Sequence, residues 1–493
     1  MNVLMIAAIL VPTIAGILVS CLKLNRKSLL FFTGAALLVT ALISTPLIFG
    51  KETGTFLLFS MTEKLNVSLR VDGISKIFLA IACYGFPAAG FFAFRYMEHE
   101  EKEGSFKEST FYSFYLLTLA ALIGMDLSAN LVAMYFFFEM ITLLSMPLVL
   151  FERSKESIAA ALKYLFYSIA GAFLALGAIF VLAAYTTTLD FTPGGNLDTS
   201  LTAGHETLIF IMVLLGVMGF SAKAGMYPLH GWLPTAHPAA PAPASAVLSG
   251  IIAKAGVLAV IRLIYYSLGA SFISGSWVQI TLLSLSLLTV FMGSMMAYRE
   301  NNLKKRLAYS SISQISYAQF GIFLLTPAGL EGGLLQVLFH AAAKMCLFLT
   351  AGSLIYNKNL RRVEDMKGIG RVMPWTMGAF TLAGLSLIGI PPFGGFVSKW
   401  VLADGALNSG ISVLSWLGPV ILLISALLTA GYLLPVTIAG FFPGKDYKTK
   451  ERSREGGVLM ILPMLILGVL TIVLGIFSGS ISSFIEKVVS VLF

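Results

Sequence analysis

The sequence predicts an all-α, polytopic membrane protein with about fourteen transmembrane helices. Of its 493 residues, 57% are hydrophobic and only 12% are charged, whereas soluble domains are about half apolar and about a quarter charged. Apolar runs of roughly the 20 residues that a spanning helix needs recur along nearly the whole chain. A soluble protein of this composition would leave hydrocarbon exposed to water, so we expect the lipid bilayer to be its solvent.

The apolar runs divide the chain into its expected spans. They lie near residues 3–22, 29–50, 74–97, 110–125, 128–150, 158–185, 206–226, 243–266, 277–297, 303–325, 331–356, 374–406, 413–441 and 457–477. The seventh and twelfth are less regular than the others. The first is expected to be retained, because its basic cluster follows the apolar run, whereas a signal peptide carries its positive charge in front.

The basic residues are distributed unequally between the loops. The loops after odd-numbered spans hold most of the 33 Lys and Arg residues. The loops after even-numbered spans and the C-terminal tail hold only Lys51, Lys64, Arg70, Lys76 and Lys487. Because loops rich in Lys and Arg stay in the cytoplasm, we expect a cell-membrane protein with both termini on the outer side.

Composition excludes several other classes of function. The net charge of +9 forms no basic stripe or tail that would indicate nucleic-acid binding. The acidic stretch EHEEKE at 98–103 is interpreted as a solvated loop rather than a metal site. The three cysteines show no CxxC spacing, and the chain has no haem-ligand or nucleotide-binding pattern. We therefore predict no metal and no cofactor, and any redox chemistry would belong to partner subunits.

Ionisable residues inside the predicted spans give the strongest indication of function. A charge at the bilayer centre costs about 2.5–3.5 kcal/mol on insertion scales. Several such charges are tolerable only if they face a hydrated interior and interact with one another. The residues predicted to form a path for ions on this basis are Glu139, Lys223, Lys254, His340, Lys344 and Lys399.

Structural alternatives exist for several of these positions. Lys163 and Arg262 lie near span ends, where their side chains can extend to the membrane surface. Lys223 and Lys399 lie beside helix breaks, where a lysine can bond freed carbonyl groups instead of carrying protons. His340 can be a hydrogen-bonded core residue.

Two spans are expected to be interrupted. Pro228 and Pro234 fall in PLHGWLP at the end of the seventh span, and Pro391 and Pro392 fall in GIPPFGGF within the twelfth. Proline removes a backbone donor and clashes with the preceding turn. Interrupted helices at corresponding places in two halves indicate inverted repeats with the transport site at the breaks. His230, between the first two prolines, is a candidate relay.

The breaks divide the chain into four expected parts. Spans 1–3 occupy residues 1–108, the first five-helix repeat 109–267, the second repeat 268–441, and the last helix with its tail 442–493. In this scheme Lys163 corresponds to Lys344.

The tenth span, LAYSSISQISYAQF, is polar for a membrane helix. Ser310, Ser313, Gln314 and Tyr317 recur at helical spacing. They can hold neighbouring helices together, or form a hydrogen-bonded water wire between the two halves. Both interpretations stay open.

These motifs together resemble a known family. The glutamate of span 5, the lysine before PLHGWLP, LAYSSISQ, HAAAK and GIPPFGGFVSK resemble the antiporter-like subunits of respiratory complex I. That family includes the A-type and D-type subunits of Mrp sodium/proton antiporters and equivalent subunits of membrane-bound hydrogenases. The resemblance covers spans 4–13. By length and by its lysine at position 399, the chain looks most like the D-type Mrp protein or its hydrogenase counterpart.

The resemblance implies roles for individual residues. It makes Glu139 and Lys223 an ion pair, Lys254 the central relay, His340 with Lys344 the next step, and Lys399 the terminal site. Opening the ion pair would pass a proton to Lys254 and onward through water. Asn302 departs from the family pattern, which often has an acidic residue there.

Three functions stay open at this point. The chain is expected to be the proton-carrying subunit of an Mrp-type Na⁺/H⁺ antiporter, working with other membrane subunits. The alternatives are an ion-pumping subunit of a redox-driven hydrogenase or NADH-quinone oxidoreductase, and a structural membrane subunit that transports nothing. We do not expect the chain to be an enzyme itself.

Overall fold

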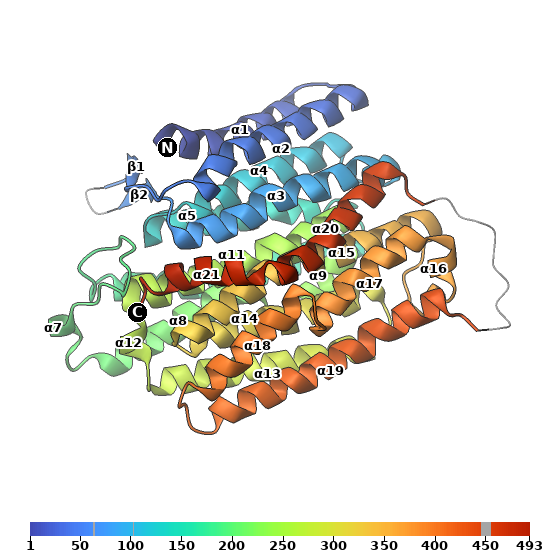
Figure 1. The fold of residues 1–493 in the computed structure, drawn as a ribbon. Helices are drawn as coiled ribbons and strands as arrows, with labels where there is room; N and C mark the ends of the chain where they lie inside the picture. Colours follow the sequence, from blue (N-terminus) through green and yellow to red (C-terminus); the bar gives the residue numbers. More distant parts are fainter. Residues whose placement is uncertain (63–64, 102, 445–454) are drawn as a thin grey trace.

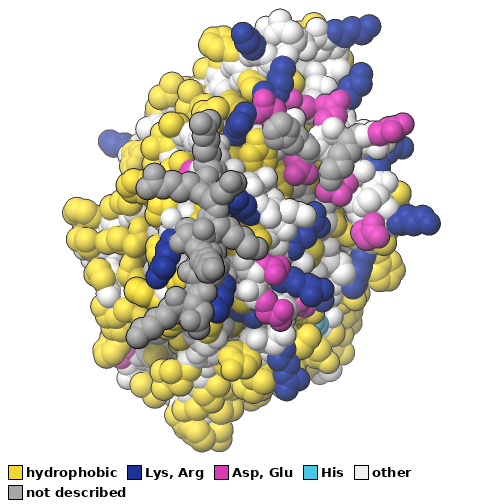
Figure 2. Space-filling view, turned by 90° about the vertical axis from the view of Figure 1, so that its right-hand side faces the viewer, with side chains coloured by type: hydrophobic (Ala, Val, Ile, Leu, Met, Phe, Trp, Pro, Cys, Tyr) yellow, Lys and Arg dark blue, Asp and Glu magenta, His cyan; other side chains and the backbone are white. Residues whose placement is uncertain are grey.

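The computed structural model describes residues 1–62, 65–101, 103–444 and 455–493. Its long helices lie side by side and run between two loop faces (Figure 1). The face at the right of Figure 1 carries the loops after odd-numbered spans, and we call it the basic face. Figure 2 shows Lys, Arg, Asp and Glu side chains gathered over this face, with hydrophobic side chains along its margins. The opposite face carries the hairpin β1–β2 and helices α7 and α12.

The N-terminal part consists of three long helices and a hairpin. The elements are α1 (Asn2–Cys21), α2 (Arg26–Phe49), β1 (Phe56–Ser60), β2 (Asn66–Leu69), α3 (Gly73–Tyr96) and η1 (Met97–His99). The two strands pair antiparallel. Asn25 and Asp72 begin α2 and α3, because their side chains accept hydrogen bonds from backbone N–H groups of the first turn.

The next part contains the first broken helix. It comprises α4 (Glu108–Asp126), α5 (Leu131–Val149), α6 (Lys155–Leu182), α7 (Thr199–Thr202), α8 (Glu206–Ala224) and α9 (Leu233–Ala239). One further span follows, in which α10 (Ala242–Val247), the π-helix η2 (Leu248–Ile252), α11 (Ala253–Ile261) and the π-helix η3 (Arg262–Leu268) are continuous. This span is buried along its whole length and forms the centre of the bundle.

The C-terminal half contains the second broken helix. Its elements are α12 (Ala270–Ile273), α13 (Trp277–Arg299), α14 (Leu303–Phe323), α15 (Pro327–Lys358), η4 (Val363–Met366), α16 (Ile369–Val372), α17 (Pro374–Ile388), α18 (Gly394–Leu407), α19 (Leu414–Phe441), α20 (Val458–Ile476) and α21 (Ser478–Val489). Asn302 is the N-cap of α14 and accepts a hydrogen bond from the backbone N–H of Lys305 at 3.1 Å. The residue that departs from the family pattern therefore has a structural role.

Eleven helices of the described ranges are long and apolar enough to cross a membrane, which confirms a multi-pass membrane protein. Helices α4 and α14 and the pair α17–α18 coincide with the three remaining predicted spans, so a total of fourteen stays a prediction. The sequence did not predict the hairpin or α21. Residues 478–489 were expected to be a tail, but they form a helix whose Ile485 and Val489 are buried.

Candidate functional site

The first break separates α8 from α9 by eight residues. Gly225 ends α8 with φ +83°, a left-handed conformation that favours glycine. Pro228 lies within the break, whereas Pro234 lies in the first turn of α9, where a helix tolerates proline. The indole N–H of Trp232 donates to the carbonyl of Ala222 at 2.9 Å. The break therefore leaves polar backbone groups at membrane depth, and side chains bond them.

The second break separates α17 from α18. Gly389 ends α17 in the left-handed conformation, and Pro391 and Pro392 follow before α18 begins at Gly394. Both breaks contain a cis prolyl bond, at Tyr227–Pro228 and at Pro391–Pro392. The expectation that spans seven and twelve are interrupted agrees with this geometry.

Lys223 lies in the last turn of α8 and is completely buried. Its ammonium group donates to the hydroxyl of Thr142 at 2.5 Å and to the carbonyl of Phe138 at 3.3 Å. It also lies 4.4 Å from the centroid of the Phe138 ring. The charge is therefore held against α5 by neutral acceptors and an aromatic face.

Glu139 follows Phe138 on α5, next to the groups that bind Lys223. Within the described residues, no ion pair of 4.0 Å or less joins these two side chains, and Oε1 of Glu139 is buried without a hydrogen-bond partner. The residues one turn away on the same side of α5, Phe136 and Leu143, are 37% and 50% exposed. The structure thus places the expected pair on adjacent helices without direct contact.

Lys254 lies at the start of α11, directly after the π-helix η2. Its ammonium group donates to the carbonyl of Ser249 at 2.7 Å, and the side chain is 2% exposed. A π-helical turn displaces one residue from the regular ladder and is frequent at functional sites. Here it supplies the carbonyl that Lys254 binds.

His340 and Lys344 lie one turn apart on α15, and both are buried. Lys344 donates to the carbonyl of Leu307 at 2.9 Å. Neither ring nitrogen of His340 has a hydrogen-bond partner among the described residues. The charges of Lys254, Lys344 and Lys399 act on this imidazole, so His340 lies where the lysines from three helices converge.

Lys399 lies on α18 beside the second break. Its ammonium group donates to the carbonyls of Leu387 and Ile388, the last residues of α17, and lies 5.3 Å from the centroid of the Tyr317 ring. These are the contacts of a lysine that bonds freed carbonyls at a helix end. Lys399 and Lys223 also lie on opposite sides of their breaks, one after and one before.

The polar face of α14 mostly binds neighbouring helices. Ser310 accepts from the hydroxyl of Tyr432 at 2.6 Å, Ser313 lies 2.8 Å from Ser294, and the hydroxyl of Tyr317 donates to the carbonyl of Leu422 at 2.7 Å. These bonds connect α14 with α13 and α19, as interhelical packing contacts do.

Gln314 extends the polar face of α14 toward the second break. Its side-chain carbonyl accepts from Gln336 of α15 at 2.9 Å, and Gln336 in turn accepts from Ser398 at 2.7 Å. Ser398 precedes Lys399. This chain of amides and a hydroxyl joins α14, α15 and α18 at the site.

His230 and Lys163 lie together beside the first break. The imidazole of His230 stacks on the ring of Tyr227 at 5.6 Å, and the charge of Lys163 acts on it. The Cε atom of Lys163 lies 3.8 Å from where a Cβ at Gly231 would be. The structure thus brings the candidate relay and a half-buried lysine together.

His237 is a buried ionisable residue that the sequence interpretation missed. It lies on α9, is fully buried, and stacks on Phe348 at 4.7 Å. Neither of its ring nitrogens has a partner among the described residues, and the charges of Lys304, Lys344 and Lys254 act on it. Its position inside the proline-rich break, in TAHPAAP, was the available sequence signal.

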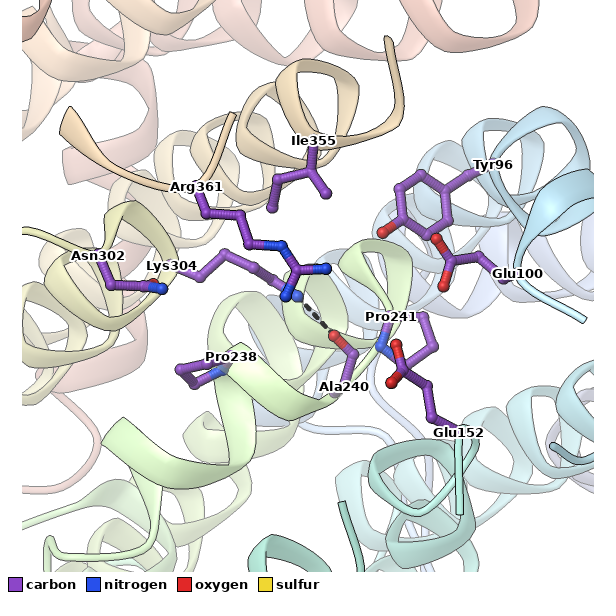
Figure 3. Close-up of a pocket in the computed structure, with 10 residues that line it drawn as sticks. All are labelled: Tyr96, Glu100, Glu152, Pro238, Ala240, Pro241, Asn302, Lys304, Ile355 and Arg361. Atoms are coloured by element: carbon purple, nitrogen blue, oxygen red, sulfur yellow. Dashed lines mark hydrogen bonds between the residues drawn. The ribbon is translucent and has the colours of Figure 1, made fainter. Parts of the chain in front are cut away.

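A small polar pocket opens on the basic face directly beside this histidine (Figure 3). It has a volume of about 70 Å³. Its lining residues are Tyr96, Glu100, Glu152, Pro238, Ala240, Pro241, Asn302, Lys304, Ile355 and Arg361. The ammonium group of Lys304 donates to the carbonyl of Ala240 at 2.5 Å, and it is one of the charges that act on His237. The pocket therefore lies between the basic face and the buried lysines.

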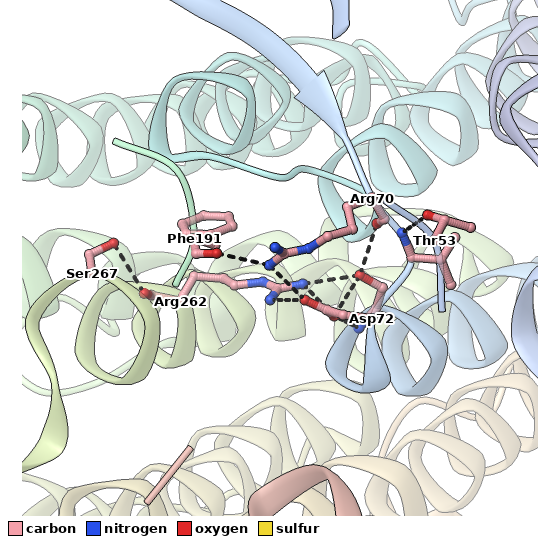
Figure 4. A network of polar contacts seen from close by, with 8 residues as sticks. Thr53, Arg70, Asp72, Phe191, Arg262 and Ser267 are labelled. Carbon is pink, nitrogen blue, oxygen red and sulfur yellow. Dashed lines mark hydrogen bonds and ion pairs between the residues drawn. The ribbon is translucent and has the colours of Figure 1, made fainter. Parts of the chain in front are cut away.

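Arg262 corrects one expectation. Its side chain does not extend to the membrane surface but is 1% exposed. It donates to both carboxylate oxygens of Asp72, at 2.6 and 2.9 Å (Figure 4). The guanidinium also lies 4.5 Å from the Tyr266 ring. Burial alone would raise the pKa of Asp72, but the attraction and hydrogen bonds of Arg262 hold it well below its usual value.

Comparison with known proteins identifies relatives of the chain. Residues 128–429 match the family described as NADH:quinone oxidoreductase/Mrp antiporter, transmembrane. The N-type protein of the NADH-quinone oxidoreductase of Desulforudis audaxviator is 32% identical over 85% of this chain and 83% of the relative. The D-type protein of the Na(+)/H(+) antiporter of Bacillus subtilis is 27% identical over 99% and 96%. Hydrogenase-4 component B of Escherichia coli is 30% identical over 84% of this chain, which spans 63% of that relative.

Solved structures share the fold over the full length. A chain of the membrane-bound sulfane sulfur reductase, an archaeal respiratory membrane complex, matches with a TM-score of 0.86 at 22% identity, covering 99% and 97% of the two chains. A chain of the Mrp complex from Dietzia sp. DQ12-45-1b matches with a TM-score of 0.83 at 22% identity, covering 100% and 98%. The resemblance found in the sequence is thereby confirmed.

Proposed function

Because the chain belongs to the NADH:quinone oxidoreductase/Mrp antiporter transmembrane family, we propose that it is the proton-translocating subunit of a multi-subunit Mrp-type Na⁺/H⁺ antiporter. The observation that carries this proposal is the series of buried lysines and histidines that crosses the centre of the bundle from one helix break to the other. The match to a D-type antiporter protein over 99% of this chain and 96% of the relative supports the Mrp assignment.

The proposed proton path contains Glu139, Lys223, Lys254, His340, Lys344 and Lys399. Each of the four lysines binds a carbonyl or hydroxyl oxygen and no carboxylate among the described residues. A neutral acceptor can keep its position whether the lysine is charged or neutral, whereas a carboxylate would favour only the charged form. This arrangement allows each lysine to accept and release a proton without large movement.

Water completes the path in this proposal. Buried polar groups are nearly always hydrogen-bonded to protein or to ordered water. The ring nitrogens of His340 and His237 have no partner among the described residues. Water bound to these imidazoles would connect Lys254, Lys344 and Lys399, whose charges already act on His340.

Partner subunits would cover the two ends of the path. At one end, Glu139 lies between exposed Phe136 and Leu143. At the other end, Lys399 lies between Phe396 and Trp400, which are 36% and 67% exposed. An ionisable group near lipid is costly, so neighbouring membrane subunits are proposed to bury both ends.

The orientation and the repeats remain part of the proposal. The basic face would lie in the cytoplasm and both termini outside, in the cell membrane. Residues 109–267 and 268–441 would form two inverted five-helix repeats between the N-terminal helices 1–108 and the C-terminal part 442–493. The two helix breaks, five spans apart, support this division.

A redox-driven ion pump is the second candidate. It is favoured by the 32% identity to a protein of an NADH-quinone oxidoreductase, against 27% for the antiporter protein. The TM-score of 0.86 to a chain of an archaeal respiratory complex favours it as well. In that case the residues of this chain would keep their roles, and the redox chemistry would occur on other subunits.

Proton flux in vesicles that contain the complete complex separates these candidates. A Na⁺ gradient imposed without an electron donor should drive proton flux, and Lys223→Ala should abolish it. The matched control is Lys51→Ala, which changes an exposed lysine near the hairpin. Flux that requires an electron donor would establish the redox-driven pump instead. Flux that Lys223→Ala leaves intact would overturn the assigned path.

A further inference from the structure

An apolar groove of about 690 Å³ lies between the N-terminal helices and the C-terminal half. Its walls come from α2, α3, α15, α20 and α21, and in Figure 1 α20 and α21 lie between α3 and the helices of the C-terminal half. The groove lies on the far side of α3 from α4 and does not include the buried lysines of the proposed path. Its occupant is therefore a separate question from the path of protons.

Small side chains leave this space unfilled. Ala80, Gly85 and Ala88 form the α3 wall, and Ala341 and Ala342 form the α15 wall. The remaining wall is almost entirely apolar, with Lys76 as its one charged residue within the described ranges. An apolar space of this kind does not hold ordered water, and in a bilayer it has to be filled by hydrocarbon or by protein.

The length of the groove indicates which of these fills it. Along α3 the lining residues extend from Lys76 to Ala88, which is about 18 Å at the helical rise of 1.5 Å per residue. One leaflet of the hydrocarbon core is about 15 Å thick, half of the total. A partner helix that crosses the membrane would need a groove of about 30 Å. The groove therefore matches an acyl chain of a single leaflet.

The mouth of the groove carries a positive charge. Lys76 lies in the first turn of α3, at the face of the molecule that carries the β1–β2 hairpin. Its ammonium group donates to the carbonyl of Gly50 at 2.8 Å, and exposed Lys51 follows Gly50. No carboxylate lines the groove among the described residues. This end is suited to a phosphate group at the membrane surface.

We propose that the groove binds an anionic phospholipid, with one acyl chain along α3 and α15 and the phosphate beside Lys76. The lipid fills the space between α3 and α15, so it joins the N-terminal helices to the C-terminal half. The proposal does not depend on whether protons or sodium ions cross the chain.

Native mass spectrometry of the purified complex tests this proposal, with phosphatidylglycerol and phosphatidylcholine as probes. Ala80→Phe should fill the groove and remove the retained lipid. Lys76→Gln should weaken phosphatidylglycerol binding several-fold, to the level of phosphatidylcholine. The matched controls are Ala426→Phe, at a half-buried alanine of α19, and Lys23→Gln, at an exposed lysine of the basic face. Both controls should retain the lipid.

A milder variant, Ala88→Leu, tests the deep end of the groove if Ala80→Phe prevents assembly. Lipid retention equal in Ala80→Phe, Ala88→Leu and wild type would overturn the proposal. Loss of a membrane subunit from the complex, with lipid binding unchanged, would also overturn it and show that a partner helix occupies the groove. Equal loss in the Lys23→Gln control would reduce the role of Lys76 to general surface charge and contradict the assigned phosphate position.

Discussion

The guanidinium of Arg262 binds both carboxylate oxygens of Asp72, a residue 190 positions earlier in the chain. Asp72 is at the same time the N-cap of α3, accepting from the backbone N–H of Ser75 at 2.9 Å. The pair therefore joins the start of an N-terminal helix to the end of the central span that carries Lys254. Arg70 adds a second, more exposed contact to Asp72 at 3.3 Å.

Removal of one partner of this pair should strongly destabilise the protein. Asp72→Asn leaves a buried guanidinium without its counter-charge, which costs about 3–5 kcal/mol for buried pairs. We expect a lower melting temperature of the purified complex. Arg70→Gln, which removes the more exposed contact, is the matched control and should have a small effect. A loss for Asp72→Asn no larger than for Arg70→Gln would show that the buried pair contributes little.

The same pair predicts how stability responds to acid. The pKa of Asp72 is lower in the folded protein than its ordinary value of 3.8. Its contribution is therefore fully present above the unfolded pKa and is lost as the pH falls through the folded pKa. The melting-temperature difference between wild type and Asp72→Asn should stay constant from pH 7 to about pH 4.5 and narrow only below about pH 4. Narrowing near pH 6 would implicate a different group.

The sequence predicted the helices well because their signals are local. Apolar runs of spanning length and prolines such as Pro228 and Pro391 act within a few residues, and the observed helices and breaks agree with them. The charges of the path were also visible, because an ionisable residue in an apolar run needs a reason.

Contacts between distant segments could not be predicted in the same way. Nothing near Arg262 indicates that Asp72 approaches it, so the arginine was interpreted as a span-end residue. The acceptors of Lys223 are equally hidden, since Thr142 is an ordinary residue of α5. His237 was different, because a histidine inside a proline-rich break carried a local signal that was overlooked.

Thr142 provides a test of how Lys223 is held. A hydrogen bond to a charged group contributes about 1.5–3 kcal/mol, so Thr142→Val should change the balance between bound and released ammonium roughly tenfold to a hundredfold. We expect slower proton flux and a shifted dependence of flux on pH, with assembly intact. Thr40→Val is the control, because that buried hydroxyl bonds only the carbonyl of Ala36 in its own helix. An unchanged pH dependence in Thr142→Val would place the functional contact of Lys223 elsewhere.

His237 is expected to take part in proton transfer between the polar pocket and the lysines. His237→Gln keeps a polar side chain but cannot be protonated in this range, so flux should fall about tenfold or more, as for loss of a general acid or base. His205→Gln changes an exposed histidine that contacts Tyr185 and should leave the flux unchanged. Equal flux in both variants would make His237 a packing residue that supports Phe348.

Lys399 has two roles that separate variants can distinguish. Its bonds to the carbonyls of Leu387 and Ile388 stabilise the end of α17, and its ammonium group is proposed to end the proton path. Lys399→Gln keeps an N–H donor for these carbonyls without a transferable charge, whereas Lys399→Met leaves them unbonded, at about 1–3 kcal/mol for a buried polar group. If the lysine carries protons, both variants should lose flux in vesicles, and only Lys399→Met should also lower the melting temperature. If it only bonds the helix end, Lys399→Gln should transport normally, and the path would then end at Lys344.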